Sequence, residues 1–302
     1  MKILILALLS ASPALATDWP QWRGPEVNNH AAASAKPVTE WSADKNVRWK
    51  TPIPGRGHST PIVVGDRLYL TTSEKEKSTQ SLLALDRKSG KVIWNKIIHK
   101  GGFPVNLHKE NSAASQTAQW DGSNILVVFE NDKKIKTTAV TPKGEIVWTK
   151  TVGDYLPSFH FGYGSTPVLY NKDLIVVVGT IEGGFITSLN TADGNESWRI
   201  KRDGHDYWAT PVVAKIAGKE QLLISGTGKI SSYDPSNGKL FWEAPLAPQS
   251  TCGTVVWTDD MVFGSGGYPK NETAGIMADG SKKVVWRNRE RCYEQSLLSY
   301  RD

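Results

Sequence analysis

The sequence predicts an all-β protein in which one four-stranded unit recurs along the chain, and three observations lead to this prediction. A glycine turn that leads into a strand with tryptophan occurs five times, with the tryptophans 44 to 54 residues apart. A threonine segment precedes each tryptophan by 31 to 34 residues. Glycine (27 residues) and proline (16) are frequent, and no long apolar stripe of helical period follows the N-terminus. Four strands in a unit of about 45 residues are typical of a β-propeller blade.

The first element is a predicted secretory signal peptide over residues 1–16. Lys2 supplies its positive end, Ile3–Leu9 its apolar region, and Ala14–Ala16 an Ala-x-Ala cleavage site. The apolar run is too short to span a bilayer, which takes about 20 residues. No cysteine follows it, so no lipid anchor is expected. We therefore expect a soluble, exported protein, periplasmic or extracellular, that begins near Thr17.

Residues 17–46 are predicted to be an N-terminal strap that precedes the propeller. The propeller itself is expected to cover residues 47–302 as one domain, because no linker interrupts the repeats. Trp49 lies 45 residues before Trp94. Val47–Trp49 is therefore predicted to be an outer strand that the N-terminus donates to the last blade, which would close the ring.

Each repeat is predicted to have the same internal order. The threonine segment opens the first strand, and a turn of glycine, aspartate or asparagine leads to an apolar second strand such as Ile125–Phe129 or Leu174–Val178. Continuous apolar runs of this kind indicate strands buried on both faces. An aspartate or asparagine then opens the turn before the fourth strand in three of four clean copies, where it is expected to bond nearby backbone.

The repeated glycines and tryptophans are predicted to be structural at every copy. Glycine supplies the positive φ of the turn, and tryptophan supplies a large apolar surface for packing between blades. These residues are Gly90, Trp94, Gly144, Trp148, Gly194, Trp198, Gly238 and Trp242, with Trp286 closing a degenerate fifth copy.

Composition narrows the possible functions. The net charge is +6, but the basic residues are dispersed, so a solvated basic surface is expected rather than a nucleic-acid interface. Cys252 and Cys292 precede equivalent strands of successive repeats. A disulfide between them and two free buried thiols both remain open, since disulfide geometry is demanding. Neither cysteine belongs to a metal-binding pattern.

The repeat motif Asp/Asn-x-x-x-Gly-x-x-x-Trp resembles the repeat of the pyrroloquinoline-quinone-type (PQQ-like) β-propeller family. Asp18–Pro25, His108–Ser115 and Gly162–Pro167 are similar to further segments of that family, notably its exported members from planctomycete-type bacteria. The resemblance covers residues 18–302. The family includes quinoprotein dehydrogenases, the outer-membrane assembly scaffold BamB and sensor domains attached to kinases.

The resemblance implies a ring of seven or eight blades, whereas five complete units are found here. Cys292–Asp302 is predicted to be the first strand of a sixth unit. We therefore expect a chain that is incomplete at its C-terminus, with a genuine open or five-to-six-blade assembly as the alternative. An open ring would leave sheet edges and an apolar blade face exposed.

The resemblance also implies what a catalytic member needs. Family enzymes hold the quinone between a tryptophan and a disulfide of adjacent cysteines, bind calcium through Glu, Asn and Asp side chains, and use an Asp as the base. This sequence has no Cys-Cys pair, and no such carboxylate set is found at matching positions. PQQ with calcium is thus not supported by the residues, and no catalytic or metal-binding residue is assigned. His205 and Asp206 form a candidate base and orienter, with a solvated loop as the alternative.

A binding surface at the mouth of the central channel is predicted instead. Segments that enter the first strands converge there, and four of them carry a histidine. The candidate contact residues are Arg56, His58, His108, Asn111, His160, Tyr163, His205, Asp206 and Trp208. The predicted function is an exported binding or scaffold module for a protein, peptide or glycan of the cell envelope, without nucleic acid and not membrane-spanning. A PQQ-dependent dehydrogenase is the alternative.

Overall fold

The computed structural model describes residues 18–300 apart from residues 105, 158 and 182, so the predicted signal peptide lies outside the described residues. Within these limits the chain forms twenty strands and no helix, so no helix there can cross a membrane. The strands make five antiparallel sheets, each with four strands in chain order. The first two sheets are β1 (Ile62–Val64), β2 (Arg67–Glu74), β3 (Thr79–Asp86), β4 (Val92–Lys100), β5 (Gln119–Trp120), β6 (Ile125–Asn131), β7 (Lys134–Val140) and β8 (Ile146–Asp154).

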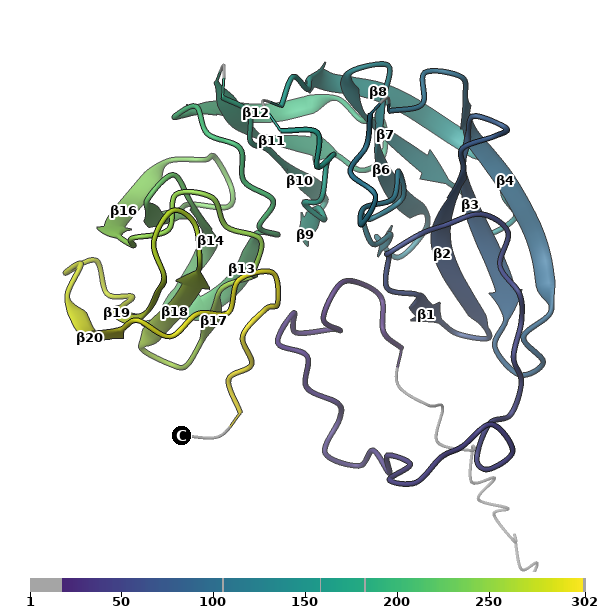
Figure 1. Ribbon diagram of the computed structural model, residues 1–302, viewed down its shortest axis with the longest axis horizontal. Helices are drawn as coiled ribbons and strands as arrows, with labels where there is room; N and C mark the ends of the chain where they lie inside the picture. Colours follow the sequence, from purple (N-terminus) through teal and green to yellow (C-terminus); the bar gives the residue numbers. More distant parts are fainter. Residues whose placement is uncertain (1–17, 105, 158, 182, 301–302) are drawn as a thin grey trace, which may run out of the picture.

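The other three sheets continue the same pattern. They are β9 (Val168–Tyr170), β10 (Asp173–Val178), β11 (Gly184–Asn190), β12 (Glu196–Arg202), β13 (Val212–Ile216), β14 (Lys219–Gly226), β15 (Lys229–Tyr233), β16 (Leu240–Pro245), β17 (Val256–Trp257), β18 (Met261–Gly266), β19 (Glu272–Met277) and β20 (Val284–Asn288). Figure 1 shows the sheets side by side along an arc, with the first strand of each innermost and the fourth outermost. The predicted all-β propeller architecture with five complete blades is confirmed.

The blades pack through apolar residues that alternate between two neighbours. In β6, residues Ile125–Phe129 are each at most 1% exposed. Ile125, Val127 and Phe129 pack against the first sheet, whereas Leu126 and Val128 pack against the third. Similar clusters join the third sheet to the fourth and the fourth to the fifth. The second strands are therefore buried on both faces, as their continuous apolar runs predict.

The turn before each fourth strand follows the predicted chemistry. The carboxylates of Asp86 and Asp234 and the amide oxygen of Asn190 each accept a backbone N–H two or three residues further on, at 2.7 to 2.9 Å. The glycines that close these turns have φ between +70° and +92°. A side chain in that conformation is strained, which explains why glycine recurs there.

Trp94, Trp148 and Trp198 each lie against the glycine turn of the following blade. A Cβ atom added to Gly238 would be 2.8 Å from the ring of Trp198, and one added to Gly194 would be 2.8 Å from Trp148. The indole of Trp148 also donates to the carbonyl oxygen of Thr191 at 2.9 Å. The turn glycine therefore allows both the backbone conformation of the turn and the packing of the neighbouring tryptophan.

Val47–Trp49 was predicted to be an outer strand, and this prediction is wrong because residues 47–50 form no strand. Trp49 nevertheless occupies the position of a repeat tryptophan. A Cβ atom on Gly90 would lie 2.4 Å from its ring, and its indole donates to the carbonyl oxygen of Arg87 at 3.1 Å. The Trp49 side chain packs against this turn, but its backbone pairs with no neighbouring strand in the described part of the chain.

A chain of threonines joins the inner strands around the axis. The backbone N–H of Thr60 donates to the hydroxyl of Thr117 at 3.1 Å, Thr117 donates to Thr166, and Thr166 donates to Thr210, each at 3.0 Å. The threonine repeat in the sequence is thus explained by bonds between blades. One of each pair is buried, so the bond satisfies a donor that water does not reach.

The segment after the fifth sheet makes a bond of the same kind without forming a strand. The hydroxyl of Ser296 accepts the N–H of Thr254 at 3.1 Å. The prediction of a further first strand after Cys292 is wrong for the described residues, which form no regular element there. Cys252 and Cys292 are both free thiols, and burial raises the pKa of Cys252 to about 11.

The strap crosses the inner ends of several blades. Trp19 pairs with Val63 through two backbone bonds of 2.8 and 2.9 Å, and the carbonyl oxygen of Pro20 accepts from Trp120 at 3.0 Å. Arg23 donates to the carbonyl oxygen of Leu297 at 2.9 Å. Figure 1 shows this purple segment between the first and last sheets. It therefore connects parts of the arc that are far apart in sequence.

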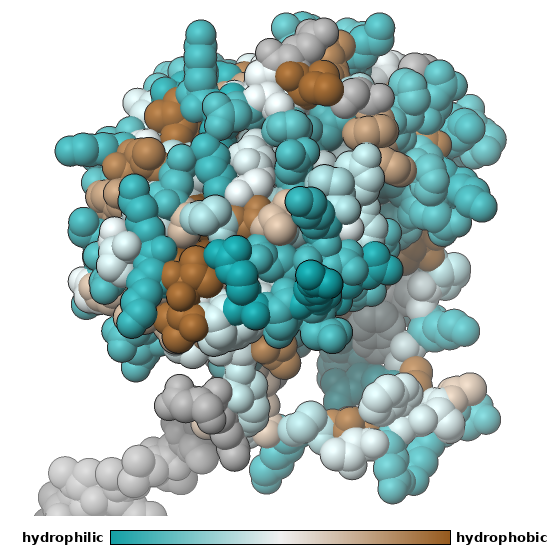
Figure 2. All heavy atoms as spheres, turned by 60° about the vertical axis from the view of Figure 1, so that its left-hand side comes forward, coloured by the Kyte–Doolittle hydropathy of each residue, from teal (hydrophilic) through white to brown (hydrophobic). Residues whose placement is uncertain are grey.

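Apolar side chains on the outer strands are exposed but scattered. Ile93 on β4 is 46% exposed, Val147 on β8 is 47% and Leu240 on β16 is 47%. In the space-filling view of Figure 2, apolar groups on the visible face are separated by hydrophilic side chains. Scattered apolar residues of this kind are normal on soluble proteins and do not indicate a site.

Candidate functional site

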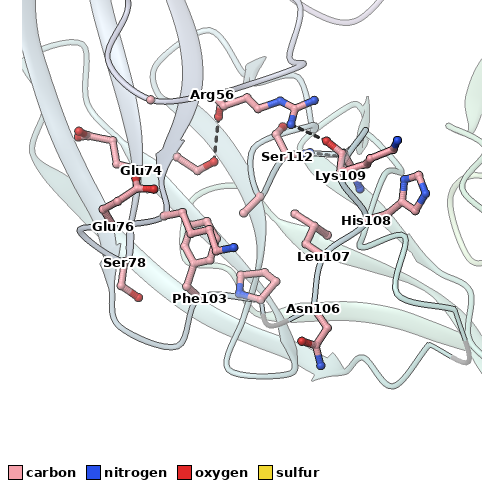
Figure 3. Close-up of a pocket in the computed structure, with 16 residues that line it drawn as sticks. Arg56, Glu74, Glu76, Ser78, Phe103, Asn106, Leu107, His108, Lys109 and Ser112 are labelled. Atoms are coloured by element: carbon pink, nitrogen blue, oxygen red, sulfur yellow. Dashed lines mark hydrogen bonds between the residues drawn. The ribbon is translucent and has the colours of Figure 1, made fainter.

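A groove of about 840 Å³ lies between the first and second sheets. One wall comes from the β2–β3 turn and the residues before β1, and the other from the connection between β4 and β5 (Figure 3). Three predicted contact residues, Arg56, His108 and Asn111, line this groove. Its volume is within the range of small-ligand and peptide sites.

Hydrogen bonds fix the two walls of the groove. Arg56 forms two backbone bonds with Ser73, of 2.8 and 3.0 Å, and its guanidinium donates to the carbonyl oxygen of Lys109 at 2.6 Å, as Figure 3 shows. The buried amide of Gln80 donates to the carbonyl oxygen of Ala113 at 2.8 Å. The long β4–β5 connection is therefore tied to the first blade, although it contains no strand.

Beside the groove lies a five-residue segment, residues 159–163, here called the mouth loop. Its successive carbonyl oxygens accept hydrogen bonds from surrounding groups. The N–H of His108 donates to His160 at 2.8 Å, and the amide of Asn111 donates to Phe161. The indole of Trp208 donates to Gly162 at 2.8 Å. The donors come from segments on either side of the loop, so no single blade determines its conformation.

The same loop is held through two of its N–H groups. Phe159 donates to the carboxylate of Asp206 at 3.1 Å, and Tyr163 donates to the carboxylate of Glu130 at 3.1 Å. The hydroxyl of Tyr155 adds a bond of 2.9 Å to the carbonyl oxygen of Gly162. These bonds satisfy most of the loop's backbone groups and define its conformation.

The mouth loop directs two phenylalanines outward. Phe159 and Phe161 are 45% and 43% exposed. The ring of Phe161 lies at 5.2 to 5.7 Å from the rings of His108, Phe159 and Trp208. These four rings are called the aromatic cluster. Two exposed phenylalanines on a fixed backbone form the kind of anchor that binding surfaces use.

Two half-buried titratable groups on neighbouring sheets, Glu130 and His99, have shifted pKa values, and Glu130 contacts the mouth loop. Burial raises the pKa of Glu130 to about 7, although the Tyr163 N–H partly opposes this. Burial, with a smaller contribution from Lys136, lowers the pKa of His99 to about 4. The His99 ring contacts Phe129 at 5.9 Å, and its buried Nε2 has no hydrogen-bond partner among the described residues. The pKa of Glu130 is therefore higher than its ordinary value, and the pKa of His99 is lower.

A second cavity, of about 410 Å³, lies on the axis of the arc. It is lined by Trp208 and His58 of the predicted set, and also by Trp19, Trp22 and Arg23 of the strap. The hydroxyls of Thr166 and Thr210, which line it, already accept backbone N–H groups of the preceding blades. The predicted channel-mouth residues are therefore divided between two cavities rather than gathered in one.

The remaining predicted residues support the surface or lie beside it. Tyr163 and Asp206 are only 4% exposed, and the Tyr163 hydroxyl donates to the carbonyl oxygen of Val177 at 2.8 Å. Both hold the mouth loop rather than face solvent. His160 is exposed, and His205 is half-buried. Of the predicted base and orienter, Asp206 accepts the N–H of Phe159 at 3.1 Å through one carboxylate oxygen.

Sequence reasoning did not select Phe159, Phe161 or Glu130. The aromatic run from Phe159 to Tyr163, in which His160 and Gly162 separate three rings, is a signal in the sequence. Glu130 is likewise visible as a charge at the end of an apolar strand. What the sequence did not reveal was which of the aromatic residues are exposed.

Five blades in chain order, closed by glycine–tryptophan turns and joined by threonines around an axial cavity, define a propeller of the PQQ-like repeat class. The family model described as outer membrane protein assembly factor BamB matches residues 30–158 and 80–290. The chain therefore belongs to this PQQ-like repeat family.

Dehydrogenases are among the relatives and solved structures to which the chain is similar. A polyvinylalcohol dehydrogenase from a Pseudomonas species is 24% identical over 233 residues, which are 72% of this chain. Quinohemoprotein alcohol dehydrogenases from Comamonas testosteroni and Pseudomonas putida superpose with TM-scores of 0.57 and 0.55, at 15% and 14% identity, over 92% and 91% of this chain. At this identity the structures show a shared fold.

The match covers only part of each relative. The chain spans 24% and 32% of the curated relatives it matches, and 50% and 48% of the two alcohol dehydrogenases. No three His, Cys, Asp or Glu side chains of the described residues lie together as metal ligands, and the two cysteines are not adjacent.

Proposed function

We propose that this protein is an exported binding or scaffold module whose contact surface is the groove together with the aromatic cluster. The partner is a protein, peptide or glycan of the cell envelope. Export is supported by the N-terminal pattern of Lys2, the apolar stretch Ile3–Leu9 and the Ala14–Ala16 cleavage site. Membership in the family that includes the assembly factor BamB supports the scaffold role.

The observation that carries the proposal is the fixed mouth loop. Phe159 and Phe161 remain nearly half exposed although their backbone is held by at least five side-chain and backbone bonds. Exposing aromatic rings to water is unfavourable, and ordering a loop costs about 1 to 2 kcal/mol per residue in backbone entropy. A rigid loop that displays apolar rings lowers the entropic cost of binding a partner.

A matched pair of variants tests this proposal. In Phe159→Ser/Phe161→Ser the aromatic anchors are removed. In Val92→Ser/Ile93→Ser, apolar residues with exposed fractions of 42% and 46% are removed from an outer strand instead. Immobilised wild-type protein should capture specific material from an envelope extract, and only the first variant should lose it. Equal capture by wild type and the Phe159→Ser/Phe161→Ser variant would contradict the proposal.

A PQQ-dependent dehydrogenase is the second candidate, and it is supported by the dehydrogenases among the relatives. It is tested by adding PQQ and calcium to the protein and measuring bound-quinone absorbance and dye reduction with alcohols or sugars. Saturable quinone binding with turnover would establish the enzyme and overturn the scaffold proposal. Neither signal is expected, because the described residues supply neither the metal ligands nor the adjacent cysteines.

A further inference from the structure

We infer that the groove between the first two blades binds an extended peptide segment of the partner, with an apolar side chain between a basic and an acidic one. This inference rests on the proposed binding function and specifies the partner's chemistry. It follows from the floor of the groove, its main-chain groups and the distribution of its charges.

The floor of the groove is apolar. Phe103, Pro104 and Leu107 line the groove and are half-buried, and Ala113 also lines it. In Figure 3 the side chains of Phe103 and Leu107 lie in the middle of the groove, between the charged groups on either side. A pocket with an apolar centre and polar edges is suited to one apolar side chain of a ligand.

The backbone of the β4–β5 connection, which forms this part of the groove, is available for pairing. Residues 103, 104 and 106–108 belong to no strand, and within the described part of the chain the backbone groups of Phe103 and Leu107 make no hydrogen bond. Extended peptides bind such surfaces through their own N–H and C=O groups, and side-chain pockets give the specificity. Main-chain pairing favours a peptide over a glycan as the occupant.

The charges are distributed on opposite sides of that floor. Figure 3 places Glu74 and Glu76 on one side of the groove and Arg56 and Lys109 on the other. Lys75 also lines the groove, next to the two glutamates in sequence. Glu74 is 20% exposed and bound to Lys77 at 2.6 Å, so Glu76 is the more accessible acid. A ligand with a basic residue toward Glu76 and an acidic one toward Arg56 complements this arrangement.

The groove lies next to the aromatic cluster. His108 lines the groove, and its ring lies 5.2 Å from that of Phe161. A peptide that occupies the groove beside His108 therefore lies close to an exposed phenylalanine.

The test uses blocked, fluorescently labelled peptides and fluorescence anisotropy. The probes are Lys-Ser-Leu-Ser-Asp, its reverse Asp-Ser-Leu-Ser-Lys, and Lys-Asp-Leu-Ser-Ser, in which both charges lie at one end. One of the first two probes should bind at least tenfold more tightly than the third, with the preferred order giving the direction of the peptide chain. Equal binding of all three would overturn the inference.

Variants of the basic wall then locate the site. Arg56→Glu/Lys109→Glu should weaken the preferred probe at least tenfold, and replacing the Asp of that probe by Lys should restore binding. Arg56→Gln/Lys109→Gln should weaken it less, and provides a variant without charge reversal. Lys88→Glu/Lys143→Glu changes the charge equally on exposed turns at the far end of the strands and should have no effect.

Failure of this inference can be separated from failure of the proposed function. If no probe is preferred but capture of envelope material still depends on Phe159 and Phe161, the peptide inference is wrong and the binding function stands. If the probes fail and that capture is also independent of the two phenylalanines, both are wrong. Loss of probe binding in the Lys88→Glu/Lys143→Glu control would show an unspecific charge effect and would also overturn the inference.

Discussion

Replacing Glu130 by Gln should make the protein more stable at alkaline pH, by an amount that depends on pH. Glu130 is buried beside the mouth loop, and its pKa is raised from 4.5 to about 7. Between pH 4.5 and about pH 7, the folded state therefore binds more protons than the unfolded state. The contribution of Glu130 to the stability of the folded state is therefore fully present below pH 4.5 and is lost as the pH rises to about 7.

The size of the effect follows from the two pKa values. A tenfold change in proton affinity is worth about 1.4 kcal/mol, so a pKa raised from 4.5 to 7 corresponds to about 3 kcal/mol at most. Gln keeps an oxygen that can accept the Tyr163 N–H but carries no charge. The free energy of unfolding of Glu130→Gln should thus equal that of wild type near pH 4.5 and exceed it by about 2 to 3 kcal/mol at pH 8.

In the wild type, His99 offsets part of this dependence of stability on pH. Its pKa is lowered from 6.5 to about 4, so its contribution is lost as the pH falls through that range. The two contributions have opposite signs between about pH 4.5 and 6.5, and they partly cancel. Removing Glu130 should therefore expose a stability that rises with pH across this interval.

Urea unfolding followed by tryptophan fluorescence from pH 4.5 to 8.5 measures these differences. Glu110→Gln, which removes a carboxylate at an exposed position of the β4–β5 connection, is the control. The reasoning is refuted if Glu130→Gln is no more stable than wild type at pH 8. It is also refuted if the gain is the same at every pH.

Two further predictions concern the repeat itself. Gly238→Ala should lower the free energy of unfolding by about 1 to 3 kcal/mol more than Gly218→Ala does. Both glycines have φ of +75°, but only the new Cβ at Gly238 would meet Trp198, at 2.8 Å. Equal losses of stability in chemical unfolding would contradict the packing role. Thr166→Val should cost about 1 to 3 kcal/mol by leaving the buried Thr117 N–H without an acceptor, whereas Thr166→Ser should retain most of the stability. A valine variant as stable as the serine variant would show that the threonine bonds contribute little.

The architecture was predictable because the features that determine it are local and repeated. The spacing of Gly90 and Trp94, and of their later copies, fixes a turn and a packing surface that do not depend on distant residues. Trp49 shows the limit of this reasoning. Its sequence context resembles a strand, but a strand needs a hydrogen-bonded neighbour, and periodicity cannot show whether that neighbour is present.

The site was predictable only in outline. The histidines before the first strands located the mouth, and His108 does lie in the groove. Tyr163 and Asp206 belong to the same segments but are buried, since contacts between blades rather than local sequence decide which side chain faces inward. The exposed positions of Phe159 and Phe161 depend on partners from residues 108–208, which sequence patterns do not bring together.

The central claim is that the mouth loop contacts a partner, and site-specific photo-crosslinking tests it most directly. A benzophenone amino acid placed at Phe161, or at the equally exposed Ile93 as a control, is activated in cells that express the protein. The account predicts a discrete crosslinked product from position 161 and none from position 93. Products of equal yield at both positions, or a product from position 93 alone, would contradict it.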